Sequence, residues 1–482
     1  MKLYNTMTKQ YEELVPLDGD TIRMYTCGPT VYDFFHVGNA RCFVIFDFLR
    51  RYLEYRGYKV NFTQNFTDID DKLIKRANEE GTTVKEVAEK YIEEYFTDAK
   101  GLGIVPATNH PKATENIPEI IDIVKTLVDN GMAYAVAPEG GSGEDKDVYF
   151  RTRKFKGYGK LSHKDIDDLI SGARIDVADI KEDPLDFAVW KAAKPGEPYW
   201  DSPWGKGRPG WHIECSAMSK KYLGNNIDIH AGGEDLAFPH HENEIAQSES
   251  YNACCGCNDT TFTRMWIHNA YILTDGQKMS KSGISFKVRD VAKQYSYEAI
   301  RFFIVSAHYR SPVNFSKEAM EQATASVERF NNCEENLAFR IKNAKDNGLV
   351  LSDEEKAMLD TFAGRRTQMI EALDYDFNTA DGIAAIFELT RDINKALSNE
   401  NLSLEFLEKA NEIFMELITL FGFQKKNTGS SDEDAEIDAL VAQRAEAKKA
   451  KDWATADKIR DDLKARGIVI EDTPQGAKWK RV

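Results

Sequence analysis

The sequence contains no run of about 18 apolar residues, which is the length that a helix needs to cross a membrane. Residues 1–6 also lack the basic stretch and apolar core that mark a secretory signal peptide. These absences argue against membrane and exported proteins, so we expect a cytoplasmic protein. The chain is long, and 482 residues with 42% apolar side chains can form a large core and more than one domain.

Positive charge is in the minority. The chain has 63 Lys and Arg against 79 Asp and Glu, a formal net charge of −16. This balance excludes a protein that coats nucleic acid through a uniformly basic surface. A local basic face can still bind phosphates, so RNA stays open as a partner.

Cysteine is also scarce, with seven residues in all. In a long chain without an export signal, burial or metal binding is favoured over a disulfide framework. Three cysteines crowd into segment 254–257, where no second Cys or His pair follows nearby. We therefore expect a surface loop with free thiols there, not a zinc ligand set. The other four are scattered: Cys27, Cys42, Cys215 and Cys333.

The first hundred residues alternate between strand and helix patterns, which predicts a parallel α/β sheet. Segment 22–27 predicts a strand. Apolar residues between 40 and 53 then fall on one helical face, and Gly57 ends that helix. Segment 59–63 predicts the next strand, which completes one βαβ unit.

A second set of such signals comes much later. Segments 227–230 and 263–268 predict two more strands, with a helix from about Pro239 between them. The Gly- and Pro-containing residues from about 120 to 200 predict an insertion that splits the α/β domain. After about residue 316 the pattern is helical with few Gly or Pro, which predicts a helical bundle.

The C-terminal region differs in charge from the rest of the chain. Residues 425–434 are polar and predict a linker. Residues 441–482 carry 11 Lys and Arg against 7 Asp and Glu, together with Trp453 and Trp479. Cations and rings of this kind suit RNA with unpaired bases, although an amphipathic surface helix explains the charges equally well.

Two segments have the composition of phosphate-binding sites. In residues 27–41, His36 and Asn39 stand at a predicted helix start, where unpaired N–H groups attract phosphate, and Gly38 would let a nucleotide approach the backbone. In Lys278-Met-Ser-Lys-Ser282, Lys278 and Lys281 could close over a triphosphate. Each segment alone is explained as well by helix capping or by a solvated basic turn.

A metal site is indicated by His240 and Glu244, which are four residues apart on a predicted helix and suit two ligands of one Zn²⁺. Cys215 and Cys27 could complete the set if the fold brings them together. Spacing alone does not select Cys27.

Together, the two phosphate-binding segments resemble the HIGH and KMSKS signatures of class I aminoacyl-tRNA synthetases, in the expected order. Asn39 replaces the second His of the first signature and keeps a hydrogen-bond donor. Segments 67–72, 211–218 and 238–244 resemble the cysteinyl branch of that family. Segments 377–379 and 467–469 also resemble this branch, and the resemblance therefore covers the whole chain.

The resemblance implies an enzyme that activates L-cysteine with ATP and Mg²⁺, and transfers it from the adenylate to the 3′-terminal ribose of tRNA-Cys. It implies a monomer with one Zn²⁺ that binds the substrate thiolate. The zinc ligands would be Cys27, Cys215, His240 and Glu244. The ATP-binding residues would be His36, Gly38, Asn39, Lys278 and Lys281, all except Gly38 being catalytic.

The resemblance also implies residues for the other substrates. The cysteine-binding residues would be Thr67, Trp211, His230 and Asp235. The anticodon would be contacted by Lys448, Trp453, Asp457 and Asp472. Four neighbours of the predicted zinc ligands are expected to bind neither metal nor substrate. Three of them are expected to be interior histidines: His212, His241 and His268. The fourth, Glu242, is expected to be a solvated helix residue.

The predicted fold is therefore an α/β, Rossmann-like catalytic domain with an insertion, followed by a helical bundle and a small C-terminal domain. The predicted boundaries are 1–119 and 201–315 for the two catalytic halves, 120–200 for the insertion, 316–424 for the bundle, 425–434 for the linker and 435–482 for the anticodon-binding domain.

Two other functions fit parts of the sequence. A ligase that passes an activated cysteine to a small amine would need the catalytic half but not the basic tail. A zinc-dependent RNA-binding protein would need the metal and the tail but neither phosphate-binding segment.

Overall fold

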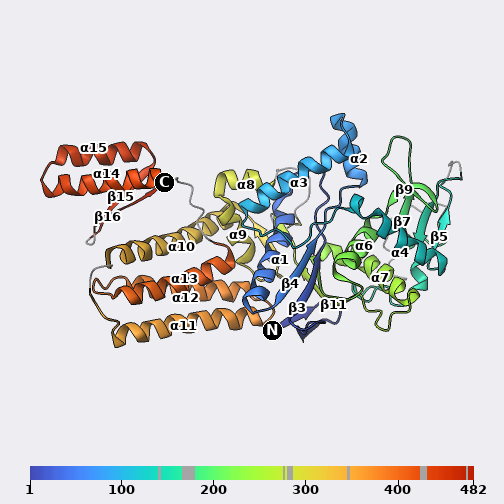
Figure 1. Ribbon diagram of the computed structural model, residues 1–482, viewed down its shortest axis with the longest axis horizontal. Coiled ribbons are helices and arrows are strands. Elements are labelled where there is room, and N and C mark those ends of the chain that lie inside the picture. Colours follow the sequence, from blue (N-terminus) through green and yellow to red (C-terminus); the bar gives the residue numbers. More distant parts are fainter. Residues whose placement is uncertain are drawn as a thin grey trace. The chain divides into compact units, whose positions relative to one another are not determined.

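The structure is a computed structural model that describes residues 1–138, 143–165, 180–274, 277–278, 286–344, 348–423, 431–473 and 476–481. The chain forms two compact units (Figure 1). The first contains residues 1–327, 367–385 and 420–422, and the second contains residues 328–366, 386–419 and 423–482.

A four-stranded parallel sheet forms the centre of the first unit, in the order β11-β10-β3-β4. These strands are β3 (Thr21–Thr26), β4 (Lys59–Gln64), β10 (Ile227–Gly233) and β11 (Thr263–Asn269). All four were predicted, as was α1 (Val37–Tyr55), which joins β3 to β4. The parallel α/β prediction is confirmed.

Helices pack against this sheet because its strands are apolar. α1 contacts β4, β10 and β11, while α6 (Trp211–Leu223) contacts β3 and β4. Tyr25 of β3 belongs to a buried cluster with Met218 of α6 and Trp266 of β11. This arrangement fixes α6 beside the carboxyl ends of β3 and β4.

Other helices and short strands of the first unit surround this centre. Two helices follow β4, and Thr83 starts the second with a capping box to Glu86. The helices are α2 (Asp71–Glu80), α3 (Val84–Gly101), α8 (Val288–Tyr295) and α9 (Tyr297–Val305). The strands are β1 (Lys2–Asn5), β2 (Gln10–Glu13), β12 (Ile272–Thr274), β13 (Gln277–Lys278) and β14 (Val313–Phe315).

Between β4 and β10 the chain forms a five-stranded antiparallel sheet, in the order β5-β6-β7-β9-β8. Its strands are β5 (Ala133–Val136), β6 (Asp147–Phe150), β7 (Phe187–Ala192), β8 (Trp200–Ser202) and β9 (Gly205–Pro209).

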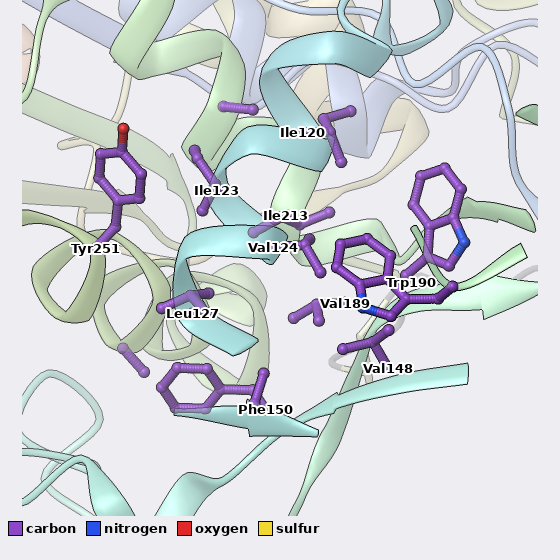
Figure 2. Close-up of a cluster of buried hydrophobic side chains, with 14 of the residues drawn as sticks. Ile120, Ile123, Val124, Leu127, Val148, Phe150, Val189, Trp190, Ile213 and Tyr251 are labelled. Atoms are coloured by element: carbon purple, nitrogen blue, oxygen red, sulfur yellow. The ribbon is translucent and has the colours of Figure 1, made fainter. Parts of the chain in front are cut away.

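The apolar stripe of α4 (Ile117–Asp129) closes the core of this sheet. Ile120, Val124 and Leu127 are three or four residues apart, so they share one face of the helix. Figure 2 shows that face packed around Phe150 of β6 and Trp190 of β7. The same cluster includes Ile213 of α6, which ties the inserted sheet to the helix that borders the central sheet.

The second unit is mainly helical (Figure 1). Aromatic contacts join its helices: Phe330 packs on Phe387, and Phe362 on Phe406. Its described helices, four of which also have residues in the first unit, are α10 (Lys317–Ala344), α11 (Asp353–Asp374), α12 (Thr379–Ala396), α13 (Leu404–Phe421), α14 (Ser431–Lys449) and α15 (Trp453–Ala465).

A hairpin, not predicted from the sequence, ends the chain: β15 (Ile468–Thr473) pairs with β16 (Gly476–Arg481). Its Ile468 packs with Ile437, Val441, Ile459 and Leu463 of α14 and α15. None of the described helices is both long and apolar enough to cross a membrane.

Candidate metal and nucleotide site

The candidate site lies at the carboxyl edge of the central sheet, where parallel strands usually bind ligands. Cys27 directly follows β3, and Thr67 comes three residues after β4. His230 is the central residue of β10. α6 contributes Cys215, and the start of α7 (Glu242–Cys254) contributes Glu244.

Four buried donors converge there: Cys27, Cys215, His240 and Glu244, whose ligand atoms all lie within 4.8 Å of one another. The two sulfurs are 3.6 Å apart, and the Cys27 sulfur is 3.5 Å from Glu244 Oε1. His240 Nε2 is 3.0 Å from the same oxygen. This cluster contains the four residues for which the resemblance implied zinc binding.

These separations match a tetrahedral metal site. With zinc–sulfur bonds near 2.3 Å and zinc–nitrogen or zinc–oxygen bonds near 2.0–2.2 Å, neighbouring ligand atoms should be roughly 3.3–3.8 Å apart. The His240 Nε2 atom is buried and has no hydrogen-bond partner, although Glu244 lies within ion-pair distance. The residues therefore fit a zinc ion with only small adjustments.

The charges of the cluster favour a cation. Burial opposes ionisation of Cys215, but the hydrogen bond from Cys27 and the nearby His240 lower its pKa to about 6. Burial likewise opposes charge on Glu244, yet His230 and His240 lower its pKa to about 2. Glu244 and Cys215 raise the pKa of His240 to about 10 against the effect of burial. In the absence of an ion, a proton on His240 offsets one of the two negative charges and leaves the other for a bound cation.

A second donor set overlaps the first and replaces Cys215 and His240 with His230 and His241. The two sets share Cys27 and Glu244, so they are alternative positions for one ion. His230 Nε2 lies 2.9 Å from Glu244 Oε2, which leaves Oε1 to face the first set. A hydrogen bond to the carboxylate oxygen that does not face the metal orients the other oxygen as a ligand, which favours the first set.

Three further histidines lie beside the metal cluster, and their rings contact one another or a ligand of the cluster. His241 lies 3.4 Å from the Cys27 sulfur and 2.9 Å from His268 Nε2, and both rings are buried. Burial lowers the pKa of His268 to about 3, so this ring is neutral. His212 Nδ1 lies 2.9 Å from His240 Nδ1. The prediction of interior histidines is confirmed for His241 and His268, although His241 also belongs to the second donor set.

The helix predicted from about Pro239 is confirmed: Phe238 has non-helical φ and ψ of −142° and 132°, and the π-helix Ala237–His241 leads directly into α7 at Glu242. One detail of this segment was predicted wrongly. Glu242 is buried, not solvated, and accepts backbone N–H groups from Leu161 and Ser162. Its carboxylate holds a loop of the inserted region beside the metal cluster.

The first phosphate-binding segment forms the start of α1. His36 is the N-cap residue, and its Nδ1 accepts the N–H of Asn39 at 3.2 Å. A Cβ at position 38 would lie 2.9 Å from the His36 ring, so Gly38 is needed for the close approach of that imidazole. Within this first turn the Gly38 N–H makes no hydrogen bond to the described residues, so it is available to an anion.

Residues after the second signature contact this helix start. The Val37 N–H donates to the Phe286 carbonyl at 2.9 Å, and the Val288 N–H donates to the Phe35 carbonyl at 3.2 Å. Lys287 pairs with Asp33 at 3.0 Å. Lys281 lies outside the described residues, and of Lys278 the structure describes only the backbone, in β13.

Of the residues expected to bind cysteine, His230 and Trp211 contact members of the metal cluster. The Thr67 hydroxyl donates to Glu214 Oε2 at 2.9 Å, and the Trp211 ring is 4.3 Å from the His240 ring and 40% exposed. Asp235 is exposed at the end of β10, where its charge acts on His36. Glu214 was missed because an acidic residue in a helix is ordinarily solvated, and nothing in the local sequence signals its burial.

The residues expected to contact the anticodon lie in the second unit. Asp472 forms a bidentate pair with Arg444, at 2.7 and 3.0 Å, and also binds Lys448 at 2.8 Å. Asp457 pairs with Arg460 at 2.8 Å. The Trp453 ring is 58% exposed and could stack on a base.

Family models match three consecutive parts of the chain. The catalytic domain of class I (C) tRNA synthetases matches residues 13–325. A DALR domain matches residues 368–425, and the cysteinyl-tRNA ligase anticodon binding domain matches residues 430–479.

Curated relatives match the chain over its full length. It is 54% identical over 486 residues to a cysteine–tRNA ligase of Clostridioides difficile, with all of both chains covered. It is 51% identical over 484 residues to that of Symbiobacterium thermophilum, covering 100% of this chain and 99% of the relative.

Solved structures share the fold at much lower identity. A methionyl-tRNA synthetase of Mycobacterium tuberculosis bound by methionyl-adenylate has a TM-score of 0.59 at 13% identity, over 83% of this chain and 92% of that one. A leucyl-tRNA synthetase complex of Agrobacterium radiobacter has a TM-score of 0.60 at 11% identity, over 85% of each chain. These likenesses confirm the predicted class I fold.

Proposed function

Because the chain belongs to the cysteine–tRNA ligase family of class I aminoacyl-tRNA synthetases, we propose that it activates L-cysteine with ATP and attaches it to tRNA-Cys, with zinc selecting the amino acid. The observation that carries the zinc proposal is the convergence of Cys27, Cys215, His240 and Glu244 at the carboxyl edge of the sheet.

Cysteine and serine differ by one atom, and a pocket that relies on packing distinguishes near-isosteres weakly. When bound, zinc would accept the substrate thiolate as a ligand, whereas a hydroxyl is a poor deprotonated ligand at neutral pH. His230 would keep Glu244 in its ligating orientation through their 2.9 Å contact. Selection would therefore depend on coordination chemistry.

The remaining site residues would position the reacting groups. The cysteine carboxylate attacks the α-phosphate of ATP and displaces pyrophosphate, and a ribose hydroxyl of the tRNA terminus then attacks the acyl carbon. The start of α1, with His36 and Asn39, would hold phosphate oxygens, together with Lys278, Lys281 and Mg²⁺. Trp211, Thr67 and Asp235 would hold cysteine. No protein nucleophile is required, so catalysis depends on orientation and charge.

We assign tRNA binding to the regions that follow the catalytic domain. Residues 316–424 would support the body of the tRNA. Residues 435–482 would contact the anticodon through exposed side chains such as Trp453. Lys448, Asp457 and Asp472 would first have to exchange their present ion-pair partners for RNA contacts.

Metal removal tests the proposal. The purified protein should contain one zinc per chain and catalyse cysteine-dependent ATP–pyrophosphate exchange, with serine inactive. Chelation should abolish exchange with cysteine, and added zinc should restore it. If the zinc-free protein still activates cysteine and rejects serine, zinc does not select the substrate. Exchange without charging of tRNA-Cys would instead indicate a ligase that uses a small amine.

A further inference from the structure

Arg41 is a buried cation in α1 that has no assigned role. Its side chain is 0% exposed. Among the described residues it forms no ion pair, although the charge of Glu234 acts on it from a longer distance. Burial lowers the pKa of Arg41 to about 10, so the guanidinium remains charged at neutral pH. A buried charge is costly unless its donors are satisfied, so the partners of this group are informative.

Backbone carbonyls are the partners of the Arg41 guanidinium. Nη1 donates to the Tyr271 carbonyl at 2.9 Å. Nη2 donates to the carbonyls of His308 and Tyr309, each at 3.3 Å, and to that of Ser311. The buried Nε has no partner among the described residues, so the two Nη atoms hold the side chain. One guanidinium thereby binds two stretches of backbone that are far apart in sequence.

These two stretches lead into the strands β12 and β14. Tyr271 directly precedes β12, and the other three carbonyls lie between α9 and β14. The two strands pair in parallel, and the Val313 N–H donates to the Tyr271 carbonyl at 3.1 Å. Arg41 therefore joins α1 to the beginning of this strand pair.

β12 leads to the second phosphate-binding segment. It pairs in antiparallel fashion with β13, and Leu273 lies opposite Lys278. The carbonyl that Arg41 holds belongs to Tyr271, two residues before Leu273. Arg41 also follows Asn39 by two residues, which places these side chains about 200° apart around the helix. One side of α1 can therefore face a nucleotide while another side fixes the strand next to Lys278.

We propose that Arg41 is a positioning residue for adenylate formation: it holds the backbone of Lys278 at a fixed distance from the start of α1. This inference rests on the proposed function, since it takes Lys278 and the start of α1 as two sides of the triphosphate site. Stabilisation of departing pyrophosphate depends on that distance, and a displacement of about 1 Å can cost roughly 100-fold in rate.

The test separates the two steps of the reaction. Arg41→Met removes the donors, and single-turnover formation of cysteinyl-adenylate should slow roughly 10- to 100-fold because the site is misaligned. Transfer from chemically synthesised cysteinyl-adenylate to tRNA-Cys follows the loss of pyrophosphate, so it should keep the wild-type rate. The zinc content should also stay unchanged. A general loss of structure would instead slow both steps.

A double-mutant cycle tests whether Arg41 acts through Lys278. In a Lys278→Met protein, the additional Arg41→Met substitution should cause no further loss in the rate of adenylate formation, because the group to be positioned is already absent. If Arg41→Met does not fold, Arg41→Lys replaces it in the same cycle and in the same two-step comparison. Lysine keeps the positive charge but lacks the planar fork that reaches several carbonyls.

Arg340→Met is the matched control. Arg340 is 8% exposed and also donates to backbone carbonyls, those of Leu397, Asn399 and Glu400. It lies in α10, within the second unit. Its substitution removes a buried guanidinium of the same kind and should leave adenylate formation by the folded protein unchanged.

Three results would overturn the inference: an unchanged rate of adenylate formation in the Arg41 variant, equal losses in the two steps, or losses from the Arg41 and Lys278 substitutions that add independently. Failure of the proposed function would look different, because the wild-type protein would then form no cysteinyl-adenylate at all.

Discussion

The two candidate binding regions differ in how their side chains are held. In the first unit, the donors of the metal cluster are at most 6% exposed, and each contacts at least one other donor or a ring that touches it. In the second unit, Trp453 is 58% exposed and the Asp472 side chain is 49% exposed. A buried, interlinked set should respond to substitution as a whole, whereas an exposed set should respond one residue at a time.

The largest effect is expected from Cys215→Ala. Loss of one thiolate from four ligands should release the zinc and lower cysteine-dependent exchange by more than about 100-fold, since replacing a residue that only orients a metal ligand already costs roughly 10- to 100-fold. Zinc content measured by atomic absorption, together with exchange rates, checks this. Cys333→Ala is the matched control, because Cys333 is equally buried but lies in α10. Zinc retained at full occupancy in Cys215→Ala would contradict the four-ligand assignment.

A second contrast concerns buried and exposed ion pairs. Arg301 and Asp47 are each 1% exposed and 2.8 Å apart, and Arg301 also donates to the carbonyls of Leu102 and Phe421. Arg301→Met should lower the free energy of unfolding by about 3–5 kcal/mol, because the buried carbonyls of Leu102 and Phe421 lose their donor and Asp47 keeps only the more exposed Arg51 as a cationic partner. Lys448→Met removes an exposed partner of Asp472 and should cost less than about 1 kcal/mol.

Urea unfolding followed by tryptophan fluorescence measures both values, since five of the seven tryptophans lie in the first unit with Arg301, and Trp453 and Trp479 lie in the second unit with Lys448. Similar losses of stability in the two variants would mean that burial does not separate these pairs.

Much of the fold followed from periodicity. The four parallel strands and α1 have apolar side chains at the spacing of a strand or a helix, and this spacing can be read from the local sequence. All five elements were predicted within a few residues of their bounds. The terminal hairpin was not predicted, because Ile468 is buried only by packing on α14 and α15. Its apolar pattern is too short to separate a strand from a loop.

Less of the candidate site could be predicted from sequence periodicity and spacing. Spacing placed His240 and Glu244 together, but Cys27 was attached to them only through the resemblance, since it lies more than 200 residues away in sequence. Glu242 was predicted to be solvated because its burial depends on the backbone of Leu161 and Ser162, about 80 residues earlier. Contacts between residues this far apart in sequence cannot be predicted from the residues that flank Cys27 or Glu242.

Asn39 tests an intermediate case, a polar side chain at the rim of the buried site. Asn39→Ala should slow adenylate formation by about 10-fold, the effect of one lost hydrogen bond to a charged phosphate, while Asn39→His should retain most of the rate because a donor remains. Single-turnover formation of cysteinyl-adenylate measures both. Equal, unimpaired rates would show that position 39 does not contact ATP, whereas equal losses would point to packing at the start of α1.

The smallest effect is expected from Lys448→Ala. Lys448 is already paired with Asp472 at 2.8 Å, and its side chain is 35% exposed, so water and salt screen its charge. Its loss should lower kcat/KM for tRNA charging by about two- to threefold and reduce the slope of log affinity against log salt by about one, as expected for one phosphate contact. ATP–pyrophosphate exchange should not change, since that reaction needs no tRNA.

Lys449→Ala is the control, because Lys449 pairs only with Glu446 among the described residues and is 75% exposed. If Lys448→Ala impaired exchange as well, the exposed set would be coupled to the buried one, and the distinction between the two regions would fail.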